Sequence, residues 1–268
     1  MTEAATPAVG ERPTKPRRSP LTYLVAIALV TWTWYAADQV GFRWSTFVDI
    51  WTNELWGLFW PIPWDWVLDR HNVIDPLIET FQIAVVATVV GCGLALPAAF
   101  AMSRLTAPNT PVYWVSRIVM SVVRAVPDLF WAKILVTAVG IGAFAGSWAL
   151  SIFSFAVMVK LFSETIDGAD PGPLEAARAT GARHVPAVRT GVLPTVLPSY
   201  VAYALYVFEL NIRASIVLGL VGAGGIGRII EAQRSFFRFD RILGILILVF
   251  VVVFVIEQIS VALRRRLV

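Results

Sequence analysis

Charged and amide side chains inside apolar sequence are the residues of this chain best suited to chemistry. Glu209, Asn211 and Arg213 lie within the apolar stretch Leu193–Ala214. Such groups are costly inside a membrane and usually face a bundle interior or a water-filled cavity. Glu209 and Arg213 are four residues apart, so they share a helix face and can form an ion pair. Either this pair neutralises itself, or Arg213 and Asn211 contact an anion that passes through the bundle.

A second arginine stands beside a proline in the apolar stretch Val112–Val139. Arg124 precedes Pro127 and Asp128 in this stretch. Proline breaks the helical hydrogen-bond ladder, and a broken helix is tolerated at membrane depth only where protein or water covers the freed backbone groups. Arg124 is therefore a second candidate for anion contact, and Asp128 is the alternative partner that would neutralise it.

Four glycines follow the stretch that carries Glu209. Gly222, Gly224, Gly225 and Gly227 lie in the sequence VLGLVGAGGIG. Their spacing matches a dinucleotide-binding fingerprint, but that fingerprint needs a strand–helix–strand unit, and here an apolar span precedes it. The glycines instead predict a tight turn in which backbone approaches backbone. This turn is expected to form an external gate, and the alternative is a turn that serves packing alone.

A polar segment with a turn glycine and a closing proline lies between two apolar stretches. It reads EAARATGARHVPAVRTGVLP over Glu175–Pro194. Glu175 suits the first turn of a helix, Gly181 suits its left-handed end, and Pro194 suits the start of the next helix. Arg183 follows the turn, and Ala176 and Ala177 favour the helix. The pattern predicts a short helix-turn-helix that a partner protein can hold.

The elements that position these residues are membrane spans. Hydrophobic residues form 57% of the 268 residues and charged residues only 15%, which is low for a soluble domain. Because a spanning helix needs roughly 20 apolar residues, we predict an all-α protein with six transmembrane helices. The six candidate spans are Leu21–Val40, Leu77–Met102, Val112–Val139, Trp148–Ile166, Leu193–Ala214 and Ile242–Leu263.

Basic residues beside these spans predict the orientation of the chain. Four flanks agree on one topology, with both termini and the Glu175–Pro194 segment in the cytoplasm. They contain Lys15, Arg17, Arg18, Arg104, Arg178, Arg183, Arg189, Arg264, Arg265 and Arg266. One segment disagrees, because Arg228, Arg234, Arg238 and Arg241 fall between the last two spans. We expect that segment to be amphipathic or partly re-entrant.

These features divide the chain into three regions. Residues 1–20 form a flexible basic cytoplasmic tail rich in proline. Residues 21–75 hold the first span and a segment with six tryptophans, which predicts helices lying in the outer interface. Residues 76–268 form a five-helix core, with residues 165–193 as its cytoplasmic coupling loop.

The polar segment also carries a resemblance to a known family. Glu175-Ala176-Ala177, Gly181 and Leu193-Pro194 match in order and spacing the EAA loop of ABC-importer permeases. That loop docks into a groove of the ATP-binding subunit. One position departs from the family, because Gly191 stands where an aliphatic residue is usual. The resemblance implies that Glu175, Ala176, Ala177, Gly181, Arg183 and Pro194 couple this chain to an ATPase.

A narrower resemblance covers the chain from Leu77 onward. The motifs ATGA, GVLP, FExNxR and VGAGGIG, within Ala179–Gly227, resemble permease subunits of phosphonate-type ABC importers, which carry phosphonate, phosphite or phosphate. The resemblance implies the type I importer permease fold and a homodimer in the inner membrane. It also implies two cytoplasmic ATPase subunits, which bind ATP and magnesium, and an external solute-binding protein. Arg124, Glu209, Asn211 and Arg213 would then line the substrate path.

Other kinds of function find less support in the sequence. It has no Walker A pattern, no HExxH or GxSxG motif and a single cysteine, Cys92. We therefore expect neither a catalytic site nor a metal or cofactor site in this chain, and no nucleic-acid partner. A stand-alone secondary transporter or channel for a small anion is the alternative, although such a protein would not need a docking loop.

Overall fold

The computed structural model describes residues 20–41 and 43–265 and contains no strand within these ranges. The predicted basic tail of residues 1–20, apart from Pro20, lies outside the described residues, as does Arg266. The chain divides into two compact units, residues 1–57 and 58–268. The all-α prediction is confirmed for the described part of the chain.

Five helical segments are long and apolar enough to cross a membrane. The first is α1 (Pro20–Gln39), and the second is Arg70–Met102, which joins a π-helix (Arg70–Ile74) to α5 (Asp75–Met102). The others are α8 (Ala143–Asp167), α11 (Leu193–Gly219) and α13 (Phe239–Arg264). These segments correspond to five of the six predicted spans.

The remaining predicted span, Val112–Val139, consists of two shorter helices. They are α6 (Thr110–Ala125) and α7 (Asp128–Val139). Between them Val126 is extended, with φ −85° and ψ 122°. The residue before a proline avoids helical angles because the proline ring crowds it, so the helix ends one residue before Val126. The expected interruption at Pro127 is confirmed, and a single continuous helix in this place is not formed.

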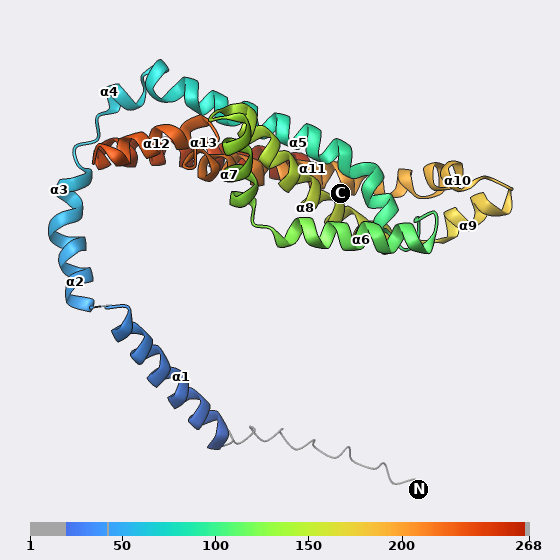
Figure 1. The fold of residues 1–268 in the computed structure, drawn as a ribbon, viewed down its shortest axis with the longest axis horizontal. Coiled ribbons are helices and arrows are strands. Elements are labelled where there is room, and N and C mark those ends of the chain that lie inside the picture. Colours follow the sequence, from blue (N-terminus) through green and yellow to red (C-terminus); the bar gives the residue numbers. More distant parts are fainter. Residues whose placement is uncertain (1–19, 42, 266–268) are drawn as a thin grey trace, which may run out of the picture. The chain divides into compact units, whose positions relative to one another are not determined.

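The core of the second unit is the packing of α5, α8 and α11 (Figure 1). A row of small residues on α5 faces α8, with Ala84, Ala87 and Ala95 fully buried. At Gly91, an added Cβ would lie 2.5 Å from the Cβ of Ser154, so the two helix backbones approach closely there. Small residues permit such contacts between membrane helices, because they leave room for van der Waals packing of the backbones.

The tryptophan-rich segment forms short helices, as predicted. They are α2 (Trp44–Asp49), a π-helix (Ile50–Glu54), α3 (Leu55–Phe59) and α4 (Trp64–Val67). Val67 is fully buried, and Arg241 lies 4.5 Å from the ring centre of Trp66, in a cation–π contact. The part around α4 is therefore packed on the helical core, and the position of the segment in the membrane interface stays a prediction.

The arginine-rich segment between the last two spans is also helical. It forms α12 (Gly225–Ser235), whose residues Gly225, Ile226 and Gly227 are buried while Arg228 is exposed. Glu231 and Arg234 form an exposed ion pair on the same helix. The part that carries Arg228 and Arg234 is thus an amphipathic helix, which is one of the two forms expected from its sequence, while Arg238 caps α13 and Arg241 lies in the first turn of that helix.

Candidate functional site

The Glu175–Pro194 segment forms a helical hairpin. It consists of α9 (Gly172–Ala179) and α10 (His184–Gly191), and α11 begins two residues later with Pro194 in its first turn. Glu175 lies in the first turn of α9, and Gly181 adopts φ +82° between the two helices. Each of these local features agrees with its sequence prediction, because caps and turns depend on residues close together in the chain.

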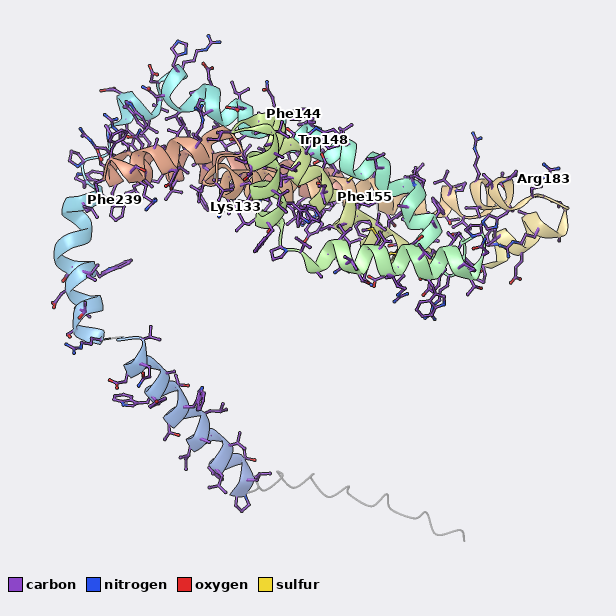
Figure 2. The ribbon with its side chains drawn as sticks, viewed as in Figure 1. Lys133, Phe144, Trp148, Phe155, Arg183 and Phe239 are labelled. Carbon is purple, nitrogen blue, oxygen red and sulfur yellow. The ribbon has the colours of Figure 1, made fainter. Side chains whose placement is uncertain are left out.

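One face of the hairpin is open, while the other is anchored. Glu175, Ala176 and Arg183 are exposed, and Val185 is 72% exposed. The hairpin projects from one end of the second unit, and Arg183 lies at its tip (Figures 1 and 2). The open face therefore presents charged groups and an apolar side chain together.

The anchored face joins the hairpin to the core through one hydrophobic cluster. This hairpin-root cluster contains Ala99, Phe162, Ile166, Leu174, Ala187, Val188, Val192 and Val196, from α5, α8, α9, α10 and α11. Leu174 is 1% exposed and Ala187 is fully buried. His184 adds a polar contact, since its Nε2 lies 2.8 Å from the carbonyl oxygen of Thr106 in the loop after α5. The hairpin therefore packs directly on three of the long helices, α5, α8 and α11.

Glu209 is the centre of a buried ion-pair cluster. Glu209 is only 5% exposed. Its carboxylate forms an ion pair with Arg213, as the spacing predicted, and a second one with Arg264, whose Nη2 lies 3.0 Å away. Arg213 is half exposed and lies 3.9 Å from a carboxylate oxygen of Glu257. Arg264 and Glu257 come from α13, and no local spacing pointed to them. Glu209 is therefore neutralised within the protein, whereas Arg213 keeps an exposed face.

Asn211 occupies a different environment, although it is only two residues away. It is fully buried, and its Nδ2 donates to Thr88 Oγ1 at 2.8 Å and to Ser154 Oγ at 2.7 Å. These bonds tie α11 to α5 and α8. In this conformation the amide has its partners inside the bundle, so its predicted place on the substrate path stays a prediction.

Arg124 is exposed at the end of α6 and borders two cavities. The smaller cavity, of about 310 Å³, also contains Asp128 in its wall. Within the described ranges, Arg124 has no ion pair, and the Asp128 carboxylate accepts from the N–H of Leu129. The alternative of neutralisation by Asp128 is therefore not seen in this conformation, and Arg124 stays available to an anion.

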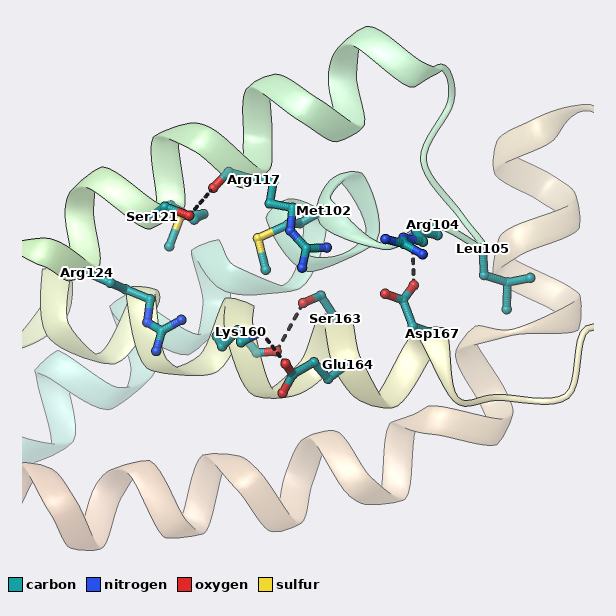
Figure 3. Close-up of a pocket in the computed structure, with 11 residues that line it drawn as sticks. Met102, Arg104, Leu105, Arg117, Ser121, Arg124, Lys160, Ser163, Glu164 and Asp167 are labelled. Carbon is teal, nitrogen blue, oxygen red and sulfur yellow. Dashed lines mark hydrogen bonds and ion pairs between the residues drawn. The ribbon is translucent and has the colours of Figure 1, made fainter.

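The larger cavity, of about 650 Å³, brings together cations that the sequence did not connect (Figure 3). Arg117 and Arg124 reach into it from α6, Arg104 from the loop after α5, and Lys160 from α8. Only Arg124 was predicted as a site residue. The signal for Arg117 was its spacing of seven residues from Arg124, which places both on one helix face.

The four glycines of the predicted gate form a close-packed junction. An added Cβ would lie 2.0 Å from the carbonyl oxygen of Ile216 at Gly227, and 2.7 Å from the backbone nitrogen of Ala143 at Gly224. The N–H of Ile226 donates to Thr80 Oγ1 at 2.7 Å. Gly222 and Gly225 both have positive φ. The predicted tight turn is formed and packs against α5 and α8, while its role as a gate stays a prediction.

Across residues 20–41 and 43–265, no group of three His, Cys, Asp or Glu side chains is placed to hold a metal ion. The arrangement of the site is instead that of a docking hairpin, an ion-pair cluster and a basic cavity. Such an arrangement is suited to binding a partner and attracting an anion.

Comparison with known proteins places these features in context. The family model described as "Binding-protein-dependent transport system inner membrane component" matches residues 77–268. The phosphate-import permease protein PhnE of Mycolicibacterium smegmatis is 40% identical over 190 residues, covering 71% of this chain and 36% of that protein. The phosphite transport system permease protein PtxC of Stutzerimonas stutzeri is 37% identical over 193 residues, covering 72% of this chain and 70% of that protein. The chain thus matches about a third of the length of the first relative and most of the second.

Solved structures with the same fold include two transporters. A chain of the MetNI methionine ABC transporter in an inward-facing conformation superposes with a TM-score of 0.63 at 22% identity, covering 73% of this chain and 95% of that chain. A chain of an amino acid ABC transporter gives a TM-score of 0.61 at 24% identity, covering 74% of this chain and 94% of that chain. At these identities the likeness establishes the fold, which is that of type I ABC importer permeases.

Proposed function

This chain belongs to the binding-protein-dependent transport system inner membrane components, and on that premise we propose that it is the permease subunit of an ATP-driven importer for a phosphorus oxyanion. It is a multi-pass membrane protein. The observation that carries the proposal is the α9–α10 hairpin, which is exposed on one face and rooted in three long helices on the other. A protein that drove transport alone would not need such a docking element.

The proposed assembly contains two copies of this chain, two cytoplasmic ATPase subunits and an external solute-binding protein. ATP and magnesium belong to the ATPase subunits. Both termini and the hairpin lie on the cytoplasmic side, which is supported by the basic flanks of four spans. Glu175, Ala176, Ala177, Gly181 and Arg183 form the docking face and its turn, and Pro194 starts the helix that carries motion into the bundle.

The proposed substrate is phosphonate, phosphite or phosphate. Two relatives, which match this chain over 190 and 193 residues, are named as phosphate and phosphite permeases. Arginine suits such cargo, because its planar guanidinium donates two parallel hydrogen bonds to an oxyanion. Arg213 and Arg124 are both exposed to some extent, so each is able to meet a passing anion.

In the proposed mechanism, ATP binding brings the ATPase subunits together and moves the docked hairpins. The hairpin-root cluster passes this motion to α5, α8 and α11. These helices then alternate between outward-open and inward-open arrangements, which makes the cluster the bistable element that ATP biases. The glycine turn at Gly222–Gly227 closes the outer side of the path.

Substitution of Val185 by aspartate tests the docking role. The side chain is 72% exposed, so the change should leave the fold intact, but it places a charge in the proposed interface. We expect the V185D variant to lose copurification with the ATPase subunit and ATP-driven uptake of labelled phosphate, phosphite or methylphosphonate into vesicles. Phe236→Asp, at a residue 74% exposed between α12 and α13, is the matched control and should keep ATPase copurification.

Two results would refute the proposal. One is a V185D protein that binds the ATPase and transports as the parent chain does. The other is phosphorus-oxyanion uptake by the purified chain without any ATPase, which would support the alternative of a stand-alone transporter.

A further inference from the structure

The cavity of about 650 Å³ is a cationic site made from three separate elements. Arg117 and Arg124 are two helical turns apart on α6, so both guanidinium groups face α8 (Figure 3). Lys160 faces them from α8, and Arg104 closes one end from the loop after α5. Convergence of four cations on one hollow gives it a positive potential that attracts an anion, because the like charges repel one another and a bound anion offsets that repulsion.

The carboxylates in the cavity wall do not supply full compensation. Glu164 pairs with Lys160 on the same helix. Asp167 accepts from the hydroxyl of Ser103 and from the backbone N–H of Arg104, each at 2.6 Å. The wall thus contains four cationic and two anionic side chains, and both anionic ones already have partners. The excess of positive charge equals the charge of a doubly ionised phosphorus oxyanion.

The two arginines on α6 are the groups left to meet such an anion. Arg117 donates to the hydroxyl of Tyr113, which also accepts from Arg104 Nε at 2.9 Å. In the described part of the chain, neither Arg117 nor Arg124 has a carboxylate partner. The hydrogen bond to Tyr113 raises the pKa of Arg104 above its ordinary value, so this side of the cavity stays positive at any physiological pH.

The cavity lies at the hairpin end of the bundle. Its wall includes the end of α5 at Met102 and the last two turns of α8, which lead directly into the hairpin. The adjoining loop carries Leu105, which packs on the hairpin-root cluster. If the hairpin faces the cytoplasm, as the proposed function requires, this cavity opens toward the cytoplasm as well.

We propose that this cavity is an inward-side binding site in which Arg117 and Arg124 hold a phosphorus oxyanion. It is the last site that the substrate occupies before its release into the cytoplasm. Lys160 and Arg104 supply the remaining positive field. This inference rests on the proposed function for the direction of transport. The binding of an oxyanion in the cavity does not depend on the proposed function. The phosphate headgroup of a lipid has the same chemistry, so the experiment must separate free anion from lipid.

The test measures binding of labelled inorganic phosphate to the assembled permease and ATPase, without nucleotide, in nanodiscs of phosphatidylcholine alone. We expect saturable binding that weakens about tenfold or more in the R124Q variant, since a charge-assisted hydrogen bond to an oxyanion contributes roughly 1.5–3 kcal/mol. The R117Q/R124Q double variant should lose binding further. Because Arg124 has no ion pair in the described part of the structure, R124Q should fold and assemble normally.

Arg228→Gln is the matched control, because Arg228 is an exposed arginine on α12 outside the cavity wall. It should bind phosphate as the parent chain does. Equal binding by the parent and the R124Q and double variants would overturn the proposal, as would absence of binding by the parent. Copurified phosphatidylglycerol that is lost only in the arginine variants, with no phosphate binding, would also overturn it and identify a lipid site.

The outcomes separate this inference from the proposed function. ATP-driven uptake by a parent chain that shows no phosphate binding in the cavity would refute the inference and leave the importer intact. Binding that depends on Arg124, in a chain that neither associates with an ATPase nor takes up phosphate with ATP, would refute the importer and leave the site intact.

Discussion

At the scale of single residues, burial decides which charges are structural. Glu209 is enclosed and has two arginine partners, whereas the side chains of Arg213 and Arg264 are 49% and 26% exposed. Removing one member of a buried ion pair leaves the other charge uncompensated, which costs more than the pair itself contributes. Loss of the central carboxylate removes the acidic partner of Arg264 and the nearer of the two acidic partners of Arg213, while loss of either arginine leaves Glu209 with one partner.

We therefore predict that Glu209→Gln destabilises the protein by about 1.5–3 kcal/mol, and that Arg213→Gln and Arg264→Gln each cost less. The midpoint of thermal denaturation of each variant in detergent measures the order of these three losses of stability. An Arg213→Gln variant as unstable as Glu209→Gln would contradict this account and assign Arg213 a purely structural role.

Glu231→Gln is the control for this series, because Glu231 pairs with Arg234 on the surface of α12. It should change stability little. The hydrogen bond from Arg234 lowers the pKa of Glu231. The contribution of this pair is therefore present at neutral pH and disappears only as the pH falls through that lowered pKa.

At the scale of elements, two glycines shape the hairpin for different reasons. Gly181 has a positive φ, and no atom lies within 4 Å of an added Cβ. Gly191 is closely packed, since an added Cβ would lie 2.8 Å from the carbonyl oxygen of Pro173 and 2.9 Å from the Cα of Leu174. The departure from the usual aliphatic residue at Gly191 thus allows α10 to pack directly on the start of α9.

This difference predicts unequal effects of substitution. Gly181→Ala should cost about 1–2 kcal/mol, the usual penalty for a left-handed residue with a Cβ, and should keep ATPase binding. Gly191→Leu should separate α10 from α9 and abolish ATP-driven uptake. Gly93→Ala, at a helical site with free space, should have no harmful effect. Normal coupling in the Gly191→Leu variant would show that contact between α9 and α10 is not required.

At the scale of the whole molecule, stability resides in the second unit. The family region, residues 77–268, lies entirely within residues 58–268. Helix α1 has no buried residue, so it adds nothing to the core of a single chain. By contrast, Val67 and Val73 are fully buried and belong to the second unit although they precede the family region.

Deletion of residues 1–57 should therefore leave the thermal midpoint of the remaining chain within a few degrees of its original value, because none of the buried residues of the described part precedes residue 58. Deletion of residues 1–74 is the informative comparison. It removes Val67 and Val73 and should lower the midpoint clearly, since loss of each buried valine costs about 1.5–3 kcal/mol of burial free energy. Circular dichroism during heating in detergent measures both, and a large effect of the shorter deletion would place part of the core in residues 1–57.

The sequence by itself determined the features that depend on neighbours in the chain. Apolar runs marked the long helices, Pro127 marked the break, and Gly181 marked the turn of the hairpin. The pairing of Glu209 with Arg213 also followed from helical spacing. These predictions succeeded because helix periodicity, caps and i,i+4 contacts are local.

Only the tertiary structure decided the contacts between distant residues. Arg264 and Glu209 are 55 positions apart in the sequence and form an ion pair, and Asn211 and Thr88 are 123 positions apart and form a hydrogen bond. The cavity of Arg104, Arg117, Arg124 and Lys160 likewise exists only because α5, α6 and α8 pack together. The physical reason is that burial and charge compensation depend on which helix faces meet, and spacing within one helix does not specify its neighbour.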